Sequence, residues 1–297
     1  MLAQRRLLSS LGTFRQFSSS ARLSLDLAHQ VYHNPQTSGA ARPDGRPIIF
    51  IHGLFGSKQN NRGMSKVLSS QLNSAVYAID LRNHGDSPHV PNHTYRDMAE
   101  DVEKFIDNHK LEKPVLLGHS MGAKAAMLLA LRSPDLVSAV ISVDNSPTST
   151  RLSESFPSYI KAMQEIEMAS VTKHSEADEI MQRVEPSLPI RQFLLTNLVR
   201  QQGDRTLRFR IPLDILGKSL PSLGSFPLTE SDDVQFNGPA LFLRGTRSRY
   251  IKDTSFPIIQ HFFPNYKVMD IDAGHWLISE NPEAFATAVV DFMKGLP

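Results

Sequence analysis

A five-residue motif, Gly118-His119-Ser120-Met121-Gly122, lies between an apolar run at residues 114–117 and a helix-forming stretch at residues 123–130. A strand, a sharp turn and a helix in this order lift a serine hydroxyl out of the fold, where a base can reach it. Glycines flank the serine because a bulkier residue on either side would clash with the backbone of so tight a turn. The motif therefore predicts Ser120 as a nucleophile, against the alternative of a structural serine.

One of the eleven histidines stands in a context suited to a base. His275 ends a turn that follows a short strand within residues 266–276, and it comes after Ser120 in the chain. The next helix has a clear start, with Asn281 as N-cap and Pro282 at the first helical position. A lone histidine is usually a surface or core residue, but this placement makes His275 the candidate base.

Two aspartates compete for the role of the acid. Asp144 follows an apolar strand at residues 136–143 and would lie at the same carboxyl edge of the sheet as the nucleophile. The later strand at residues 239–245 has no carboxylate after it until Asp253. We therefore assign the acid to Asp144, with Asp253 second. The remaining alternative is that Asp144 only caps a turn before Pro147.

A glycine-bearing loop, His52-Gly53-Leu54-Phe55-Gly56-Ser57, follows a buried strand at residues 47–51. The backbone N–H groups of Leu54 and Met121 would point at the oxyanion of a tetrahedral intermediate, the second helped by the helix that begins there. A phosphate-binding loop is the competing interpretation. We set it aside because the segment contains neither of the two common glycine-rich phosphate motifs.

Together these segments resemble the α/β-hydrolase superfamily. The residues that carry the resemblance are 52–57, 80–87, 118–122 and 273–276. Within the superfamily, residues 81–85, 122–124 and 143–147 are similar to the mitochondrial branch that includes the fungal ethanol acetyltransferases. The resemblance spans about residue 21 to the C-terminus and is weakest over residues 148–236.

This resemblance implies the α/β-hydrolase fold, with a mostly parallel central sheet, helices on both faces and an inserted helical lid. It also implies the chain order serine, acid, histidine, for which His275 is the one histidine in the right position. Many members carry the acid after the next-to-last strand, where Ser248 stands here. In the resembled branch the acid follows the sixth strand, which agrees with Asp144.

Length and pattern favour one catalytic domain. The chain has 297 residues, and strand and helix signals alternate from Arg46 onward, which predicts a single α/β domain over residues 23–297. The strand pattern lapses over residues 148–235, where amphipathic segments such as 156–169 and 177–184 predict a helical lid. Such a lid would select acyl chains and alcohols, or would only add packing.

The first 22 residues have the composition of a mitochondrial presequence. They contain four arginines and five serines, and no acidic residue occurs before Asp26. We expect a matrix protein matured near Phe17 or a few residues later. Loss of residues 1–22 moves the formal net charge from +2 to −2, so nucleic acid is not an expected partner.

Other features narrow the chemistry. The chain has no cysteine, so we expect no disulfide, thiolate nucleophile or cysteine-based metal site. No apolar stretch is long enough to predict a transmembrane helix. The histidines at positions 84, 89 and 93 lack metal-ligand spacing and are expected to be loop or pocket residues. We predict no metal site and no cofactor, with acetyl-CoA or another acyl thioester considered only as a substrate.

Five arginines lie between residues 191 and 210. Part of this cluster, above all Arg208 and Arg210, is a candidate for binding the phosphates of an acyl-CoA donor, because guanidinium groups pair well with phosphate oxygens. The alternative is a solvated helical face.

Three functional classes follow from these predictions. The first is a mitochondrial esterase or thioesterase that passes a short acyl group from an acyl-serine to water. The second is an alcohol acetyltransferase that makes acetate esters from acetyl-CoA and ethanol with the same triad. The third is a non-catalytic binding protein on a hydrolase fold, against which the intact set of Ser120, Asp144 and His275 argues.

Overall fold

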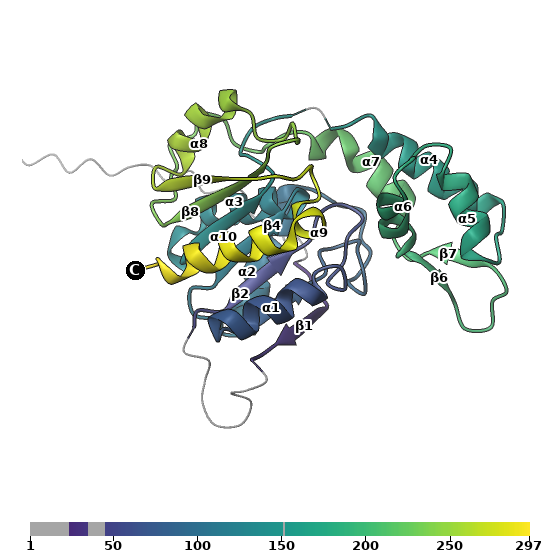
Figure 1. Ribbon diagram of the computed structural model, residues 1–297, viewed down its shortest axis with the longest axis horizontal. Coiled ribbons are helices and arrows are strands. Elements are labelled where there is room, and N and C mark those ends of the chain that lie inside the picture. Colours follow the sequence, from purple (N-terminus) through teal and green to yellow (C-terminus); the bar gives the residue numbers. More distant parts are fainter. Residues whose placement is uncertain (1–23, 35–44, 151) are drawn as a thin grey trace, which may run out of the picture.

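The computed structural model describes residues 24–34, 45–150 and 152–297 (Figure 1). The segment predicted as a presequence, residues 1–22, lies outside these ranges. The strands of the central sheet are β1 His29–Tyr32, β2 Ile48–Ile51, β3 Val76–Ile79, β4 Val115–His119, β5 Ala139–Val143, β8 Ala240–Gly245 and β9 Tyr266–Ile271.

The described strands form a seven-stranded sheet in the order β1-β3-β2-β4-β5-β8-β9. β1 runs antiparallel to β3, and the other neighbouring pairs are parallel. β2, β4 and β5 are buried along their whole length, as expected for parallel strands covered on both faces. The predicted fold class, a mostly parallel α/β sheet, is confirmed.

Helices cover both faces of this sheet (Figure 1). One face carries α1 Arg62–Leu72 and α10 Pro282–Lys294, and the other carries α2 Tyr95–Asn108, α3 Met121–Arg132 and α8 Phe256–Phe262. Successive side chains of each strand point to opposite faces of the sheet and pack against the two helix layers in turn. The shorter helical turns are η1 Pro134–Leu136, η2 Asp253–Ser255 and α9 Leu277–Glu280.

Sequence predicted the start of α10 correctly. The side chain of Asn281 accepts a hydrogen bond from the Ala284 N–H at 3.3 Å, and Pro282 is the first helical residue. The strand predicted at residues 136–143 is shorter in the structure, because Pro134 begins the turn η1 and β5 begins only at Ala139.

Between β5 and β8 the chain leaves the sheet and forms the segment predicted as a lid. Figure 1 shows it projecting to one side of the sheet. Its helices are α4 Ser155–Met168, α5 His174–Met181, α6 Leu188–Leu195 and α7 Leu213–Leu223. The lapse of strand pattern was misleading in one respect, because a small antiparallel hairpin, β6 Leu198–Arg200 with β7 Leu207–Phe209, follows α6.

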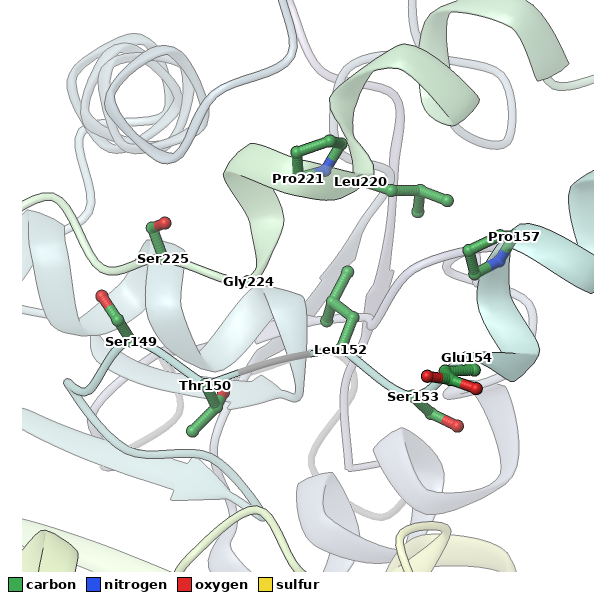
Figure 2. Close-up of a pocket in the computed structure, with 10 residues that line it drawn as sticks. All are labelled: Ser149, Thr150, Leu152, Ser153, Glu154, Pro157, Leu220, Pro221, Gly224 and Ser225. Carbon is green, nitrogen blue, oxygen red and sulfur yellow. The ribbon is translucent and has the colours of Figure 1, made fainter.

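The outgoing and returning ends of the lid are hydrogen-bonded to each other. The Thr150 N–H donates to the Gly224 carbonyl at 2.8 Å, and the Phe226 N–H donates to the Ser149 hydroxyl at 3.2 Å. A hollow of about 460 Å³ lies at this junction. It is lined by residues from the two ends and by Pro157 (Figure 2). Its lining contains none of the predicted catalytic residues.

Two core residues fasten the returning end of the lid. The ammonium group of Lys124 donates to the carbonyls of Gly224 at 3.1 Å and Ser225 at 3.3 Å. The hydroxyl of Tyr95 donates to the Leu223 carbonyl at 2.8 Å. Lys124 is 1% exposed, and burial lowers its pKa to about 8.

Candidate active site

The turn between β4 and α3 presents Ser120 in a strained conformation. Its φ is 53° and its ψ −113°, in a region that a residue with a side chain rarely adopts. Two backbone hydrogen bonds stabilise this conformation. The Ser120 N–H donates to the Val143 carbonyl at 3.0 Å, and the Ser120 carbonyl accepts from the Ala123 N–H at 3.1 Å. A side chain in place of Gly118 or Gly122 would lie within 2.6 Å of backbone atoms.

The structure brings together the three residues selected from the sequence. The Nε2 atom of His275 lies 2.9 Å from the Ser120 hydroxyl, and its Nδ1 atom lies 2.6 Å from Oδ2 of Asp144. Ser120 and Asp144 are buried, and the side chain of His275 is 15% exposed. A hydroxyl, an imidazole and a carboxylate in this row can activate the hydroxyl for attack on a carbonyl carbon.

The carboxylate of Asp144 is held from the end of β8. Oδ1 accepts from the Gly245 N–H at 3.1 Å, and Oδ2 accepts from the Ser248 hydroxyl. Asp144 itself has a positive φ of 51°. The sequence marks Ser248 only as a position where an aspartate is missing and predicts no part for it in the site. In the structure its hydroxyl is hydrogen-bonded to the carboxylate of Asp144.

Aromatic rings surround the imidazole of His275. The ring of Tyr250 stacks on it, with centroids 4.0 Å apart and planes at 21°. The Nε2 atom of His119 lies 2.9 Å from the His275 carbonyl. Burial, with His275 nearby, lowers the pKa of His119 to about 4, so His119 is neutral at physiological pH. The sequence does not predict the contact of Tyr250 with His275, because the two residues follow different strands and no local pattern marks the pair.

The two predicted oxyanion donors flank the nucleophile. Met121 is the first residue of α3, and Leu54 belongs to the loop after β2. That loop passes so close that a Cβ on Gly53 would lie 3.3 Å from the Cβ of Ser120. Glycine at position 53 therefore lets the backbone of the loop approach the hydroxyl.

Asp253, the second candidate for the acid, is engaged elsewhere. It accepts a hydrogen bond from Arg244 at 2.6 Å, and its side chain is 83% exposed. Among the described contacts of His275, the carboxylate partner is Asp144. The structure thus favours Asp144 on geometry.

Arg208 and Arg210 lie on and just after β7. Arg208 is 55% exposed, with Asp204 4.0 Å away. Arg210 reaches across to the core and lies 3.4 Å from Asp86. A third member of the cluster, Arg191, is buried and bound to Asp178 at 2.7 Å. Phosphate binding by Arg208 and Arg210 stays a prediction.

A cavity of about 330 Å³ is lined by His119 and Gly53, which adjoin Ser120, while the three triad residues are not part of its lining. The lid contributes an apolar wall from α6, and Phe193 on that wall packs on Trp276 with ring centroids 4.7 Å apart. The loop after β2 contributes a polar wall. The residues that line the cavity are His52, Gly53, Gly56, Asn60, Asn61, His119, Ser187, Pro189, Ile190, Phe193, Trp276, Ile278, Ser279 and Glu280.

The described residues lack a metal site of protein ligands and a membrane-spanning helix. They contain no cluster of three or more histidine, aspartate or glutamate side chains placed to hold a metal ion. None of the helices in the described segments combines the length and the apolar composition needed to cross a bilayer.

Comparison with protein families agrees with this geometry. A family described as "alpha/beta hydrolase fold" matches residues 46–282, which include the nucleophile turn and the end of the sheet. The chain belongs to the α/β-hydrolase family. The predicted superfamily is therefore confirmed.

Individual relatives carry two kinds of activity in their names. A "Probable alcohol acetyltransferase" of Saccharomyces cerevisiae is 39% identical over 92% of this chain and 84% of its own length. An "sn-1-specific diacylglycerol lipase ABHD11" of Mus musculus is 38% identical over 83% of this chain and 80% of its own. Fungal ethanol acetyltransferases are also among the relatives, as the resembled branch predicts.

A solved structure extends the similarity to the fold. A "Marine microorganism esterase" superimposes with a TM-score of 0.82 and 33% identity, over 91% of this chain and 100% of its own. With such relatives, the chain is an enzyme of the serine hydrolase type that cleaves esters or transfers acyl groups.

Proposed function

We propose that the chain cleaves short-chain acyl esters or thioesters through an acyl-serine intermediate. The observation that carries the proposal is the hydrogen-bonded row from Ser120 through His275 to Asp144, with distances of 2.9 and 2.6 Å. This arrangement supports catalysis because each group lies within reach of the proton that it has to move or hold. A purely binding protein would have no need of it.

In the first half-reaction the Ser120 oxygen attacks the acyl carbonyl carbon and its proton passes to Nε2 of His275. The carbonyl oxygen becomes an oxyanion facing the N–H groups of Leu54 and Met121. The bond to the leaving oxygen or sulfur then breaks, and that atom takes the proton from His275. Asp144 keeps Nδ1 protonated throughout and stabilises the imidazolium.

The second half-reaction decides between hydrolysis and transfer. An acceptor hydroxyl attacks the acyl-serine, gives its proton to His275, and Ser120 regains that proton as it leaves. Water as acceptor gives a free acid, and an alcohol gives a new ester. Transfer to ethanol from acetyl-CoA is the second candidate, which the 39% identity to an alcohol acetyltransferase over 92% of the chain supports.

The size of the cavity supports small substrates. At about 330 Å³, it lies at the lower end of the range of about 300 to 1,000 Å³ for small-molecule sites. Its apolar wall from α6 suits an acyl or alkyl chain. We therefore place the substrate among small esters and thioesters, with diacylglycerol, named for the mouse relative, as a larger alternative to be tested.

The acceptor can be determined in one experiment. The purified protein is incubated with acetyl-CoA and ethanol while free CoA and ethyl acetate are followed together, with Ser120→Ala as control. Ester formed in proportion to CoA supports an alcohol acetyltransferase, and CoA or acetate without ester supports a thioesterase. If neither forms, p-nitrophenyl esters of increasing chain length and diacylglycerol follow, and Ser120→Ala retaining ordinary activity on all would contradict the mechanism.

The assignment of the acid has its own test. Asp144→Asn is expected to lower kcat by about 10⁴-fold, because an asparagine favours the wrong imidazole tautomer. Asp253→Asn removes an exposed partner of Arg244 and is expected to leave kcat unchanged. The reverse result would move the acid to Asp253.

We also propose that the protein works in the mitochondrial matrix. The support is the composition of residues 1–22, which are rich in arginine and serine and contain no aspartate or glutamate. A fluorescent protein fused after residue 40 should enter mitochondria, and one fused to a chain that starts at Leu23 should not. Equal distribution of the two fusions would contradict the proposal.

A further inference from the structure

Two side chains from distant parts of the chain hold the backbone of Phe55, the residue after the predicted oxyanion donor Leu54. The Phe55 N–H donates to Nε2 of His84 at 3.1 Å, and the Phe55 carbonyl accepts from Nδ2 of Asn197 at 2.7 Å. His84 lies in the loop after β3. Asn197 lies in the lid, between α6 and β6.

The conformation of Phe55 needs such support. Its φ is 62°, in the left-handed region that a residue with a bulky side chain adopts only when its surroundings impose it. His84 is 0% exposed and Asn197 1%, so both contacts are shielded from solvent. Loss of one partner would leave a buried backbone group without a hydrogen bond.

The hydrogen bonds of His84 fix which of its nitrogens accepts. Nδ1 lies 3.0 Å from the Arg82 carbonyl and must donate there, which leaves Nε2 to accept from Phe55. Burial, together with the neighbouring histidines at positions 52 and 93, lowers the pKa of His84 well below its ordinary value. The ring therefore stays neutral, with its acceptor toward Phe55, across physiological pH.

A second buried histidine holds the other side of Leu54. His52 Nδ1 lies 2.8 Å from the Gly53 carbonyl, and its Nε2 accepts from the Leu81 N–H at 3.0 Å. The Gly53 carbonyl and the Leu54 N–H belong to one peptide plane. Holding that carbonyl therefore limits the directions in which the Leu54 N–H can point.

We propose that His84 and Asn197 are positioning residues, which set the direction of the Leu54 N–H by clamping Phe55, and that Asn197 thereby makes the oxyanion site depend on the docked lid. The inference rests on the proposed function, since it gives the clamp a purpose only if an oxyanion forms at Ser120. It assigns to the lid residue Asn197 a role in the reaction rather than in substrate selection.

The expected effect follows from how oxyanion donors work. They must lie about 2.7 to 3.1 Å from the place where charge develops, and losing one costs about 10²- to 10³-fold in kcat. Misalignment of a donor should lower kcat by less than its complete loss does. We expect about a tenfold fall in kcat when the clamp is opened, with little change in KM, because the ground-state substrate does not need this alignment.

The test compares full-length variants on p-nitrophenyl acetate and on a trifluoromethyl ketone, which forms a charged tetrahedral adduct with a reactive serine. Asn197→Ala removes the lid donor, and Asn197→Asp keeps the shape of the side chain without the amide donor. Asp178→Ala is the matched control, since it breaks an ion pair of the lid with Arg191 that does not reach Phe55. Thermal unfolding is recorded for each protein.

For both Asn197 variants we expect kcat to fall and the inhibition constant of the ketone to rise by a similar factor of about ten, with KM within about twofold. The control should keep the wild-type kcat and inhibition constant even where it lowers the unfolding temperature. A merely structural role would lower the active fraction without weakening the ketone, and that outcome would overturn the clamp.

His84 supplies an independent arm. His84→Leu removes the acceptor for the Phe55 N–H, whereas His84→Gln can offer its side-chain oxygen in place of Nε2. We expect the leucine variant to weaken the ketone and the glutamine variant to regain at least part of the loss. Equal behaviour of the two would contradict a role for the acceptor.

The two proposals fail differently. A wild-type protein whose turnover is lost in Ser120→Ala establishes the serine reaction, and Asn197 variants that then match wild type in kcat and in ketone binding overturn the clamp alone. A wild-type protein that turns over no ester and binds no ketone overturns both.

Discussion

Ser248 donates its hydroxyl hydrogen bond to Oδ2 of Asp144, the same oxygen that accepts from Nδ1 of His275. Gly245, at the end of β8, holds the other oxygen of that carboxylate at 3.1 Å. The end of β8 therefore orients an acid that is carried by β5. The position where many members of the superfamily carry the acid itself has become a support for it.

Ser248→Ala should slow the reaction without removing the triad. A hydrogen bond to a charged group contributes about 1.5 to 3 kcal/mol, and the Gly245 N–H remains in the variant. We expect kcat/KM for p-nitrophenyl acetate to fall about tenfold, and Ser248→Thr, which keeps a hydroxyl, to stay near wild type. An alanine variant as active as the parent would show that Asp144 needs no second donor.

Exchanging the residues at positions 144 and 248 tests whether the acid can be presented from the end of β8. Asp144→Ser alone should lose about 10³- to 10⁴-fold in kcat, as expected for loss of the acid. Adding Ser248→Asp places a carboxylate near the point where the Ser248 hydroxyl now meets Oδ2 of Asp144. We expect kcat of the double variant to be at least about tenfold higher than kcat of Asp144→Ser. Circular dichroism checks that both proteins fold. A double variant no better than Asp144→Ser would show that only β5 presents the acid at a usable angle.

The stacking of Tyr250 on His275 predicts a change in rate when the ring is removed. The ring face favours the imidazolium that forms in the transition state, an effect of about 0.5 to 2 kcal/mol. Tyr250→Leu should therefore lower kcat by about two- to thirtyfold, because the cation loses a stabilising neighbour. Steady-state kinetics on p-nitrophenyl acetate measure the change.

Tyr250→Phe is the control for that prediction. Burial, together with the nearby charge of Asp144, raises the pKa of Tyr250 to about 12, so its phenol is neutral and a phenyl ring can take its place in the stack. We expect the phenylalanine variant to keep the wild-type kcat. If it behaves like the leucine variant, the hydroxyl and not the ring face is what His275 requires.

Local sequence was enough to select Ser120 and His275, which the structure places 2.9 Å apart. Positions 118 and 122 must be glycine because a side chain there would clash with backbone atoms a few residues away or on the neighbouring strand. The N-cap that follows His275 is also a local signal. These features are readable because strand, turn and cap preferences act over short distances.

The supporting contacts could not be predicted in the same way. Ser248 and Asp144 are 104 residues apart in the chain, and Asn197 and Phe55 are 142 apart. Single polar residues at such separations carry no periodic or spacing signal. The hairpin β6–β7 was missed for a related reason, since its strands have three residues each, too few to show an alternating pattern.

Glycines at two positions should respond oppositely to alanine. A Cβ on Gly122 would lie 2.5 Å from the His52 carbonyl oxygen, whereas a Cβ on Gly63, in α1, meets nothing within 4 Å. Gly122→Ala should cost about 1 to 3 kcal/mol in the free energy of unfolding and distort the turn that presents Ser120. Gly63→Ala should stabilise by about 0.5 kcal/mol. Urea unfolding measures both, and similar values for the two would contradict the close approach at Gly122.

Lys124 should give the free energy of unfolding a dependence on alkaline pH. Its pKa is lowered by burial to about 8 in the folded protein, against 10.5 as the ordinary value. Below pH 8 the lysine is charged in both states and adds no slope. Between about pH 8 and 10 the unfolded chain binds more of the proton, so stability from this group rises with pH, by at most about 1.4 kcal/mol per pH unit.

Lys124→Met removes that slope together with the contacts to Gly224 and Ser225. Urea unfolding of wild type and variant at pH 7, 8, 9 and 10 gives the difference in their free energies of unfolding at each pH. We expect this difference to be constant up to about pH 8 and then to move in favour of wild type, because only the wild-type chain gains from deprotonation of the buried amine on folding. A difference that is flat over the whole range, or that moves in favour of the methionine variant, would show that the lysine keeps its proton where the lid joins the core.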